Sequence, residues 1–122
     1  MAIIKIFAAA AATGVIALGA SLHLTLVDSA PRDGAQLTEP PAEVLLKFNE
    51  RPDTARRGIS LRGPNGAVKM RPVRSVRDTL AFAATIEGAL APGQYTVSWL
   101  AAAPDHEPVR GRYRFTIEGM ER

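Results

Sequence analysis

The chain has 122 residues, a formal net charge of +3 and no cysteine. This length accommodates one small domain, and the lack of cysteine excludes disulfides, thiolate metal sites and cysteine nucleophiles. The arginines are scattered among acidic residues, without a basic stripe interleaved with aromatic residues. Nucleic-acid binding is therefore not expected.

Residues 1–20 have the layout of a secretory signal peptide. Lys5 supplies one positive charge, residues 6–18 form an apolar stretch, and the small residues Gly19 and Ala20 end it. This pattern predicts export and cleavage after Ala20, or as late as residue 22. Residues 21–122 would then form the single mature domain.

A retained membrane anchor is the alternative for the same segment. Leu22, Leu24 and Leu26 extend the apolar character toward the ~20 residues that a membrane span requires. We favour cleavage, because the apolar stretch is rich in alanine and charged residues begin at Asp28.

From His23 onward the pattern is that of strands, and long helical periodicity is missing. After a short first strand that begins at His23, the predicted strands are Glu43–Asn49, Gly58–Arg62, Ala67–Val73, Thr79–Ile86, Gln94–Leu100 and Val109–Ile117. The sequence G-P-N-G at 63–66 predicts a hairpin tip, because glycine and asparagine tolerate positive φ. These strands and turns predict an all-β fold, an immunoglobulin-like antiparallel β-sandwich with Greek-key connections and about seven strands.

Alternation of apolar and polar residues identifies the core face of the predicted strands. The predicted core consists of Val44, Leu46, Phe48, Ile59, Leu61, Leu80, Phe82, Ile86, Tyr95, Val97, Trp99, Tyr113 and Phe115. Tyr95, which follows Pro92-Gly93 at a strand entrance, is either a tyrosine corner like that of immunoglobulin domains or an ordinary core tyrosine.

The chain contains two histidines, and the predicted fold brings them together. His23 opens the first strand, and His106 lies between Asp105 and Glu107 in the loop before the last strand. These two segments can meet at one end of a sandwich. Imidazole and carboxylate donors suit Cu(II), although an Asp-His-Glu loop by itself is more often merely solvated.

Cleavage after Ala20 would add a second group of donors at the new N-terminus. The mature chain would begin Ser21-Leu22-His23, with an α-amine, two backbone amides and an imidazole. Four nitrogens of this kind can close a square plane around Cu(II) or Ni(II).

Three segments carry a resemblance to a known family: H-L-T-L-V-D-S-A-P-R-D-G-A at 23–35, E-V-L-L-K-F-N-E at 43–50 and L-A-P-G-Q-Y-T-V-S-W at 90–99. They resemble the CopC family of periplasmic copper-resistance proteins, which are small copper-binding sandwiches. The matching residues are His23, Ser29, Pro31, Asp33, Gly34, Phe48, Asn49, Glu50, Leu90, Gly93, Tyr95, Val97 and Trp99.

The resemblance implies a Cu(II) site made by an N-terminal histidine, its amine and an Asp-x-His motif. An ungapped match places Asp105 on the family aspartate and Glu107 on the family histidine, so that His106 falls on the position between them. Either Glu107 replaces the histidine, or the loop shifts so that His106 points inward, or copper is not bound. The candidate metal ligands are therefore Ser21, through its amine, with His23, Asp105, His106 and Glu107.

Two further departures from the family concern the terminus and the methionines. Leu22 is a poor residue before a cleavage site, so that His23 would lie two residues inside the mature terminus. The mature chain contains only Met70 and Met120, and a Cu(I) thioether site is therefore not expected.

We expect a periplasmic Cu(II) carrier or buffer, a monomer, which passes the metal to the CopD-type membrane partner that the resemblance implies. One alternative is a metal-free interaction module of the same fold, in which exposed edge strands and the row Arg110, Arg112 and Arg114 would matter. A copper enzyme of the N-terminal-histidine type is the third possibility. No catalysis is expected, because no substrate cleft is legible and Ser29 and Ser60 have no recognisable base.

Overall fold

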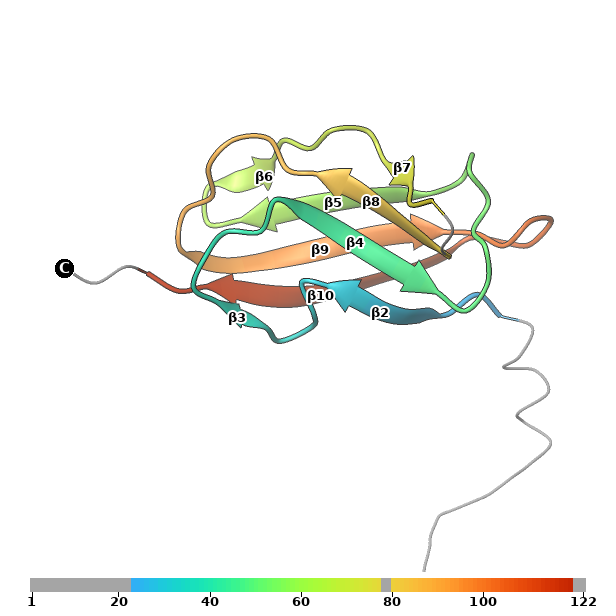
Figure 1. Cartoon of the computed structure of the whole chain (residues 1–122), viewed down its shortest axis with the longest axis horizontal. Helices are drawn as coiled ribbons and strands as arrows, with labels where there is room; N and C mark the ends of the chain where they lie inside the picture. The colour runs from blue at the N-terminus through green and yellow to red at the C-terminus, as the bar shows by residue number, and fades with distance from the viewer. Residues whose placement is uncertain (1–22, 78–79, 120–122) are drawn as a thin grey trace, which may run out of the picture.

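The computed structural model describes residues 23–77 and 80–119 of the chain (Figure 1). The predicted signal peptide and its cleavage site therefore lie outside the described residues. The strands are β2 (Leu26–Ala30), β3 (Gln36–Leu37), β4 (Glu43–Phe48), β5 (Gly58–Gly63), β6 (Gly66–Val68), β7 (Arg74–Ser75), β8 (Ala81–Thr85), β9 (Gly93–Ala101) and β10 (Val109–Ile117). No helix that could cross a membrane is found in the described part of the chain.

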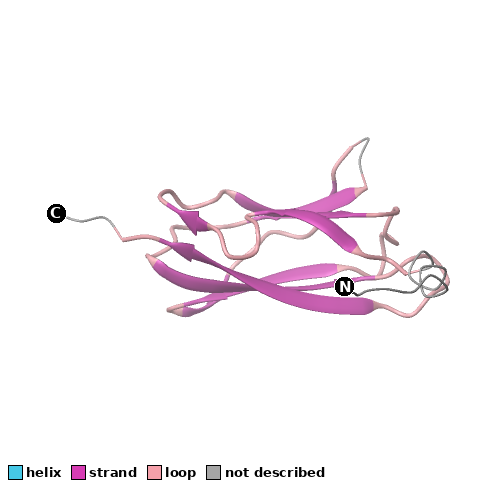
Figure 2. Ribbon diagram, turned by 90° about the horizontal axis from the view of Figure 1, so that it is seen from below, coloured by secondary structure: helices cyan, strands magenta, loops and turns pink. Residues whose placement is uncertain are grey.

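Two sheets pack face to face, as Figure 2 shows from the side. One has the order β3-β10-β9-β5-β6 and the other the order β2-β4-β8-β7. The predicted immunoglobulin-like β-sandwich is confirmed. The short strands β3 and β7 were not predicted and raise the number above the seven expected, and β3 pairs with β10 in parallel.

Aromatic rings fill the space between the sheets. The Phe48 ring stacks on Phe82 with centroids 5.4 Å apart and meets Trp99 edge-on at 5.3 Å. Most predicted core residues are buried, and Ile59, Leu80 and Trp99 are half-buried. Trp99 lies across Gly111 on the neighbouring strand, where an added Cβ would come within 2.5 Å of its ring.

Tyr95 forms a tyrosine corner, which is one of the two roles predicted for it. Its hydroxyl donates a hydrogen bond to the Ala91 carbonyl at 2.6 Å, and its ring stacks on Phe115. Burial raises the pKa of this hydroxyl. An added Cβ at Gly63 would lie 2.2 Å from the Tyr95 ring, so the close approach of β5 to this ring requires glycine.

One predicted strand is shorter than the sequence indicated, and another lacks alternation. In the segment predicted as the strand Ala67–Val73, strand β6 ends at Val68. Beyond it, one isolated bridge pairs Met70 with Ile86. Ala81–Ala84 are buried on both faces of β8. An ion pair from Arg74 of β7 to Glu43 of β4 spans β8 and covers its outer face.

Candidate metal site

The two histidines line one pocket at an end of the sandwich. Figure 1 shows that the chain before β2, the loop after β4 and the β9–β10 loop all reach this end. The pocket has a volume of about 370 Å³ and is lined by His23, Leu24, Ala103, His106, Glu107, Pro108 and Val109. The predicted meeting of His23 with the loop before the last strand is therefore found in the structure.

Asn49, directly after β4, holds the segment that carries His23. Its side-chain amide donates to the His23 carbonyl at 3.0 Å, and its side-chain oxygen accepts a hydrogen bond from the Thr25 amide at 2.8 Å. Its own backbone N–H donates to the Thr25 carbonyl. Next along the chain, Leu24 is buried in the core. The backbone of His23 is thus fixed while its side chain remains exposed at the pocket.

Arg56 holds the loop that carries His106. Its Nη1 donates to the His106 carbonyl at 2.8 Å and its Nη2 to the Ala103 carbonyl at 3.1 Å. The His106 amide also donates to the Ala103 carbonyl, which closes a turn. One planar guanidinium therefore fixes both ends of this turn, a task for which its fork of donors is suited.

Asp53 in turn orients Arg56. Its carboxylate accepts hydrogen bonds from the Ala55 amide at 2.9 Å and from Arg56 Nε at 3.0 Å. The hydrogen bond from the Ala55 amide, and to a lesser extent the one from Arg56, lowers the pKa of Asp53 below its usual value. The Asp53 amide donates to the Ala102 carbonyl at 2.7 Å, so the same segment contacts the start of the β9–β10 loop.

The candidate ligands do not all lie in the pocket. His106 and Glu107 line it and are exposed, whereas Asp105 is exposed, has a φ of 64° and is not among the lining residues. Ser21 lies outside the described residues. Within the described residues no group of three or more His, Asp or Glu is placed to hold a metal ion. The pocket thus offers two imidazoles and one carboxylate at its wall, close to solvent.

The sequence does not indicate which residues position these groups. Asn49 belongs to the F-N-E segment, but nothing in that segment indicates its hydrogen bond to His23. The roles of Arg56 and Asp53 could not be predicted from the sequence, because the partners of Arg56 in the loop are backbone carbonyls, which every residue carries.

The two packed sheets, with a histidine-lined pocket between the loops at one end, place the chain among small β-sandwich domains. The model of the CopC domain matches residues 26–118, and the chain belongs to the CopC family. This confirms the resemblance found in the sequence. A search of curated protein sequences found no match to the chain.

Solved structures of the same family resemble the chain over most of its length. PcoC from Escherichia coli, a methionine-rich copper resistance protein, has a TM-score of 0.71 and 25% identity, over 79% of this chain and 99% of that one. CopC from Methylosinus trichosporium OB3b has a TM-score of 0.72 and 26% identity, over 82% and 98% of the two chains.

Proposed function

We propose that this protein binds Cu(II) in the periplasm and acts as a carrier or buffer in copper resistance. The observation that carries the proposal is that both histidines of the chain line one pocket. Membership of the CopC family, and the copper resistance ascribed to PcoC, support copper as the ligand.

The proposed ligands are the imidazoles of His23 and His106, with Glu107 and the Ser21 amine completing the site. Nitrogen donors outcompete carboxylates for Cu(II), which favours His106 over Glu107 as the main loop ligand. Asp105, on the same turn but outside the lining, would need a rotation of the turn to contribute. Such a rotation would disturb the hydrogen bonds by which Arg56 holds this turn.

The donor chemistry favours Cu(II) over Cu(I). Thioether ligands select Cu(I), and PcoC is described as methionine-rich. Here the described residues contain one methionine, Met70, which is half-buried and packs against the core away from the pocket lining. Imidazole and carboxylate groups suit the divalent ion better.

Export and partner choice complete the proposal. Cleavage after Ala20 would release residues 21–122 into the periplasm as a monomer and supply the amine of Ser21. A CopD-like membrane protein is the proposed recipient of the metal. The role is one of binding and delivery, with no catalytic step.

The test is a stoichiometric titration of the exported protein with Cu(II) at neutral pH, after intact mass has fixed its N-terminus. One tightly bound Cu(II) per chain is expected. No binding would favour the metal-free interaction module.

A further inference from the structure

Four arginines lie on the outer face of the five-stranded sheet. Arg110, Arg112 and Arg114 alternate along β10 with residues that face the core, including the buried Tyr113. Arg62 likewise follows the buried Leu61 on β5. Because successive side chains of a strand point to opposite faces, these four arginines share the solvent face of the sheet.

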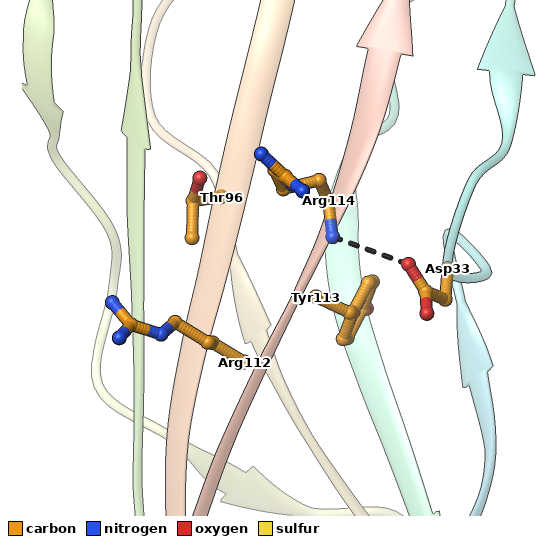
Figure 3. A pocket seen from close by; sticks show the side chains of 5 residues that line it. All are labelled: Asp33, Thr96, Arg112, Tyr113 and Arg114. Carbon is orange, nitrogen blue, oxygen red and sulfur yellow. Dashed lines mark hydrogen bonds between the residues drawn. The ribbon is translucent and has the colours of Figure 1, made fainter.

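The pairing of the strands brings the arginines around small hydroxyl residues of β9. Thr96 is paired with Arg114 on one side and Arg62 on the other, while Ser98 is paired with Arg112. Figure 3 shows the guanidinium groups of Arg112 and Arg114 on the β9 side of β10, the side on which Thr96 lies. A hollow of about 430 Å³ is lined by Thr96, Arg112 and Arg114, together with Tyr113 and Asp33.

These positive charges have little compensation. The ion pairs found in the described residues involve other cations, namely Arg32, Arg56, Lys69, Arg71 and Arg74. Asp33 lies beyond β10 from the guanidinium groups, where its carboxylate accepts a hydrogen bond from the Arg114 backbone amide at 3.4 Å. Glu118 follows at the far end of β10. In the other sheet, by contrast, Arg74 is paired with Glu43.

We propose that this arginine face, formed by Arg62, Arg110, Arg112 and Arg114, docks on the surface of an anionic phospholipid bilayer. Guanidinium forks match phosphate oxygens, and arginines near a bilayer are attracted by its negative surface potential. Thr96 and Ser98 occupy the middle of this face, where the core of a protein interface is typically more apolar. The inference does not depend on copper binding.

Docking in this way would set the candidate metal pocket at the margin of the contact. Arg110 directly follows Val109, which lines that pocket, and the other arginines of β10 lead away from it. The pocket would remain open to solvent beside the membrane.

The test compares sedimentation of the full chain with vesicles of phosphatidylglycerol and of phosphatidylcholine at low salt. Each arginine near an anionic surface strengthens binding roughly five-fold. The double variant Arg112→Ser/Arg114→Ser should therefore bind phosphatidylglycerol roughly 25-fold more weakly. Its matched control, Arg71→Ser/Arg74→Ser, removes the same charge from ion pairs elsewhere and should bind as the wild type does.

Thermal melts of all variants check that each is folded. Release of the wild type on raising the salt from about 0.05 M to about 0.5 M would support the proposal. Equal binding to both kinds of vesicle would point to the apolar segment 1–20 and overturn it. Equal weakening of the two double variants would also overturn it, because net charge rather than this face would then be responsible.

Discussion

Arg56 and His106, 50 residues apart in sequence, are joined by a hydrogen bond of 2.8 Å from the guanidinium to the backbone carbonyl. This contact fixes the turn that carries His106, and the side chain of His106 lines the candidate metal pocket. Arg56 is therefore a positioning residue, and the proposed site depends on a loop that contributes no ligand.

Replacing Arg56 with methionine should weaken Cu(II) binding while leaving the stoichiometry unchanged. The turn would lose its two guanidinium bonds, and groups that orient metal ligands affect affinity by roughly 10- to 100-fold. Competition with a chelator of known affinity measures the change. The control is Arg57→Met, since the neighbouring Arg57 donates to Ser75 and lies over the Phe82 ring. Equal effects of the two changes would contradict the role of Arg56.

Asn49→Ala should also weaken Cu(II) binding, because it removes both side-chain bonds that fix the segment at His23. Asn49→Asp keeps an acceptor for the Thr25 amide and loses the donor to the His23 carbonyl. Its affinity should therefore lie between those of the wild type and the alanine variant. Hydrogen exchange at residues 23–25 provides a second readout, and faster exchange in Asn49→Ala is expected. Unchanged exchange would mean that Asn49 does not hold this segment.

Asp53 gives the protein a stability component that depends on pH. Its pKa is lowered in the folded chain, so its contribution is present above the ordinary aspartate value of 3.8 and is lost as the pH falls through the lower folded value. Urea midpoints should therefore separate wild type from Asp53→Asn at neutral pH and approach each other near pH 3. A constant separation over this range would show that the carboxylate charge is not involved.

Trp99 and Gly111 should be coupled in stability. Trp99→Ala removes a ring packed on Phe48 and should cost about 3 kcal/mol, toward the lower end for tryptophan because the ring is half-buried. Gly111→Ala should cost about 1–3 kcal/mol, because the new Cβ would meet that ring. In the double variant, Gly111→Ala should add almost no further loss of stability to that of Trp99→Ala, because the ring that the new Cβ would meet is absent. Additive losses in urea unfolding would contradict the packing of Trp99 on Gly111.

The fold could be predicted from the sequence because apolar and polar residues alternate along its strands and because glycine and proline mark its turns. Gln94–Leu100 and Val109–Ile117 alternate over their length, and both are found as strands. Ala81–Ala84 broke the pattern, since alanine is small enough to be covered on both faces. The meeting of His23 with His106 followed from the expected sandwich. The hydrogen bonds from Arg56 and Asn49 to the backbone could not be predicted in this way. Every residue offers the same backbone carbonyl and N–H groups, so the sequence does not mark which of them is the partner.

The Cu(II) electron paramagnetic resonance spectrum of His106→Ala, compared with that of the wild type, shows directly whether the pocket holds the metal. We expect two imidazole nitrogens on Cu(II) in the wild type and the loss of one in His106→Ala, with a smaller change in the matched variant Glu107→Ala. His23→Ala should abolish tight binding. An unchanged His106→Ala spectrum would rule out the proposed site, because the metal would then be held by Ser21-Leu22-His23 alone and the pocket would have no part in binding.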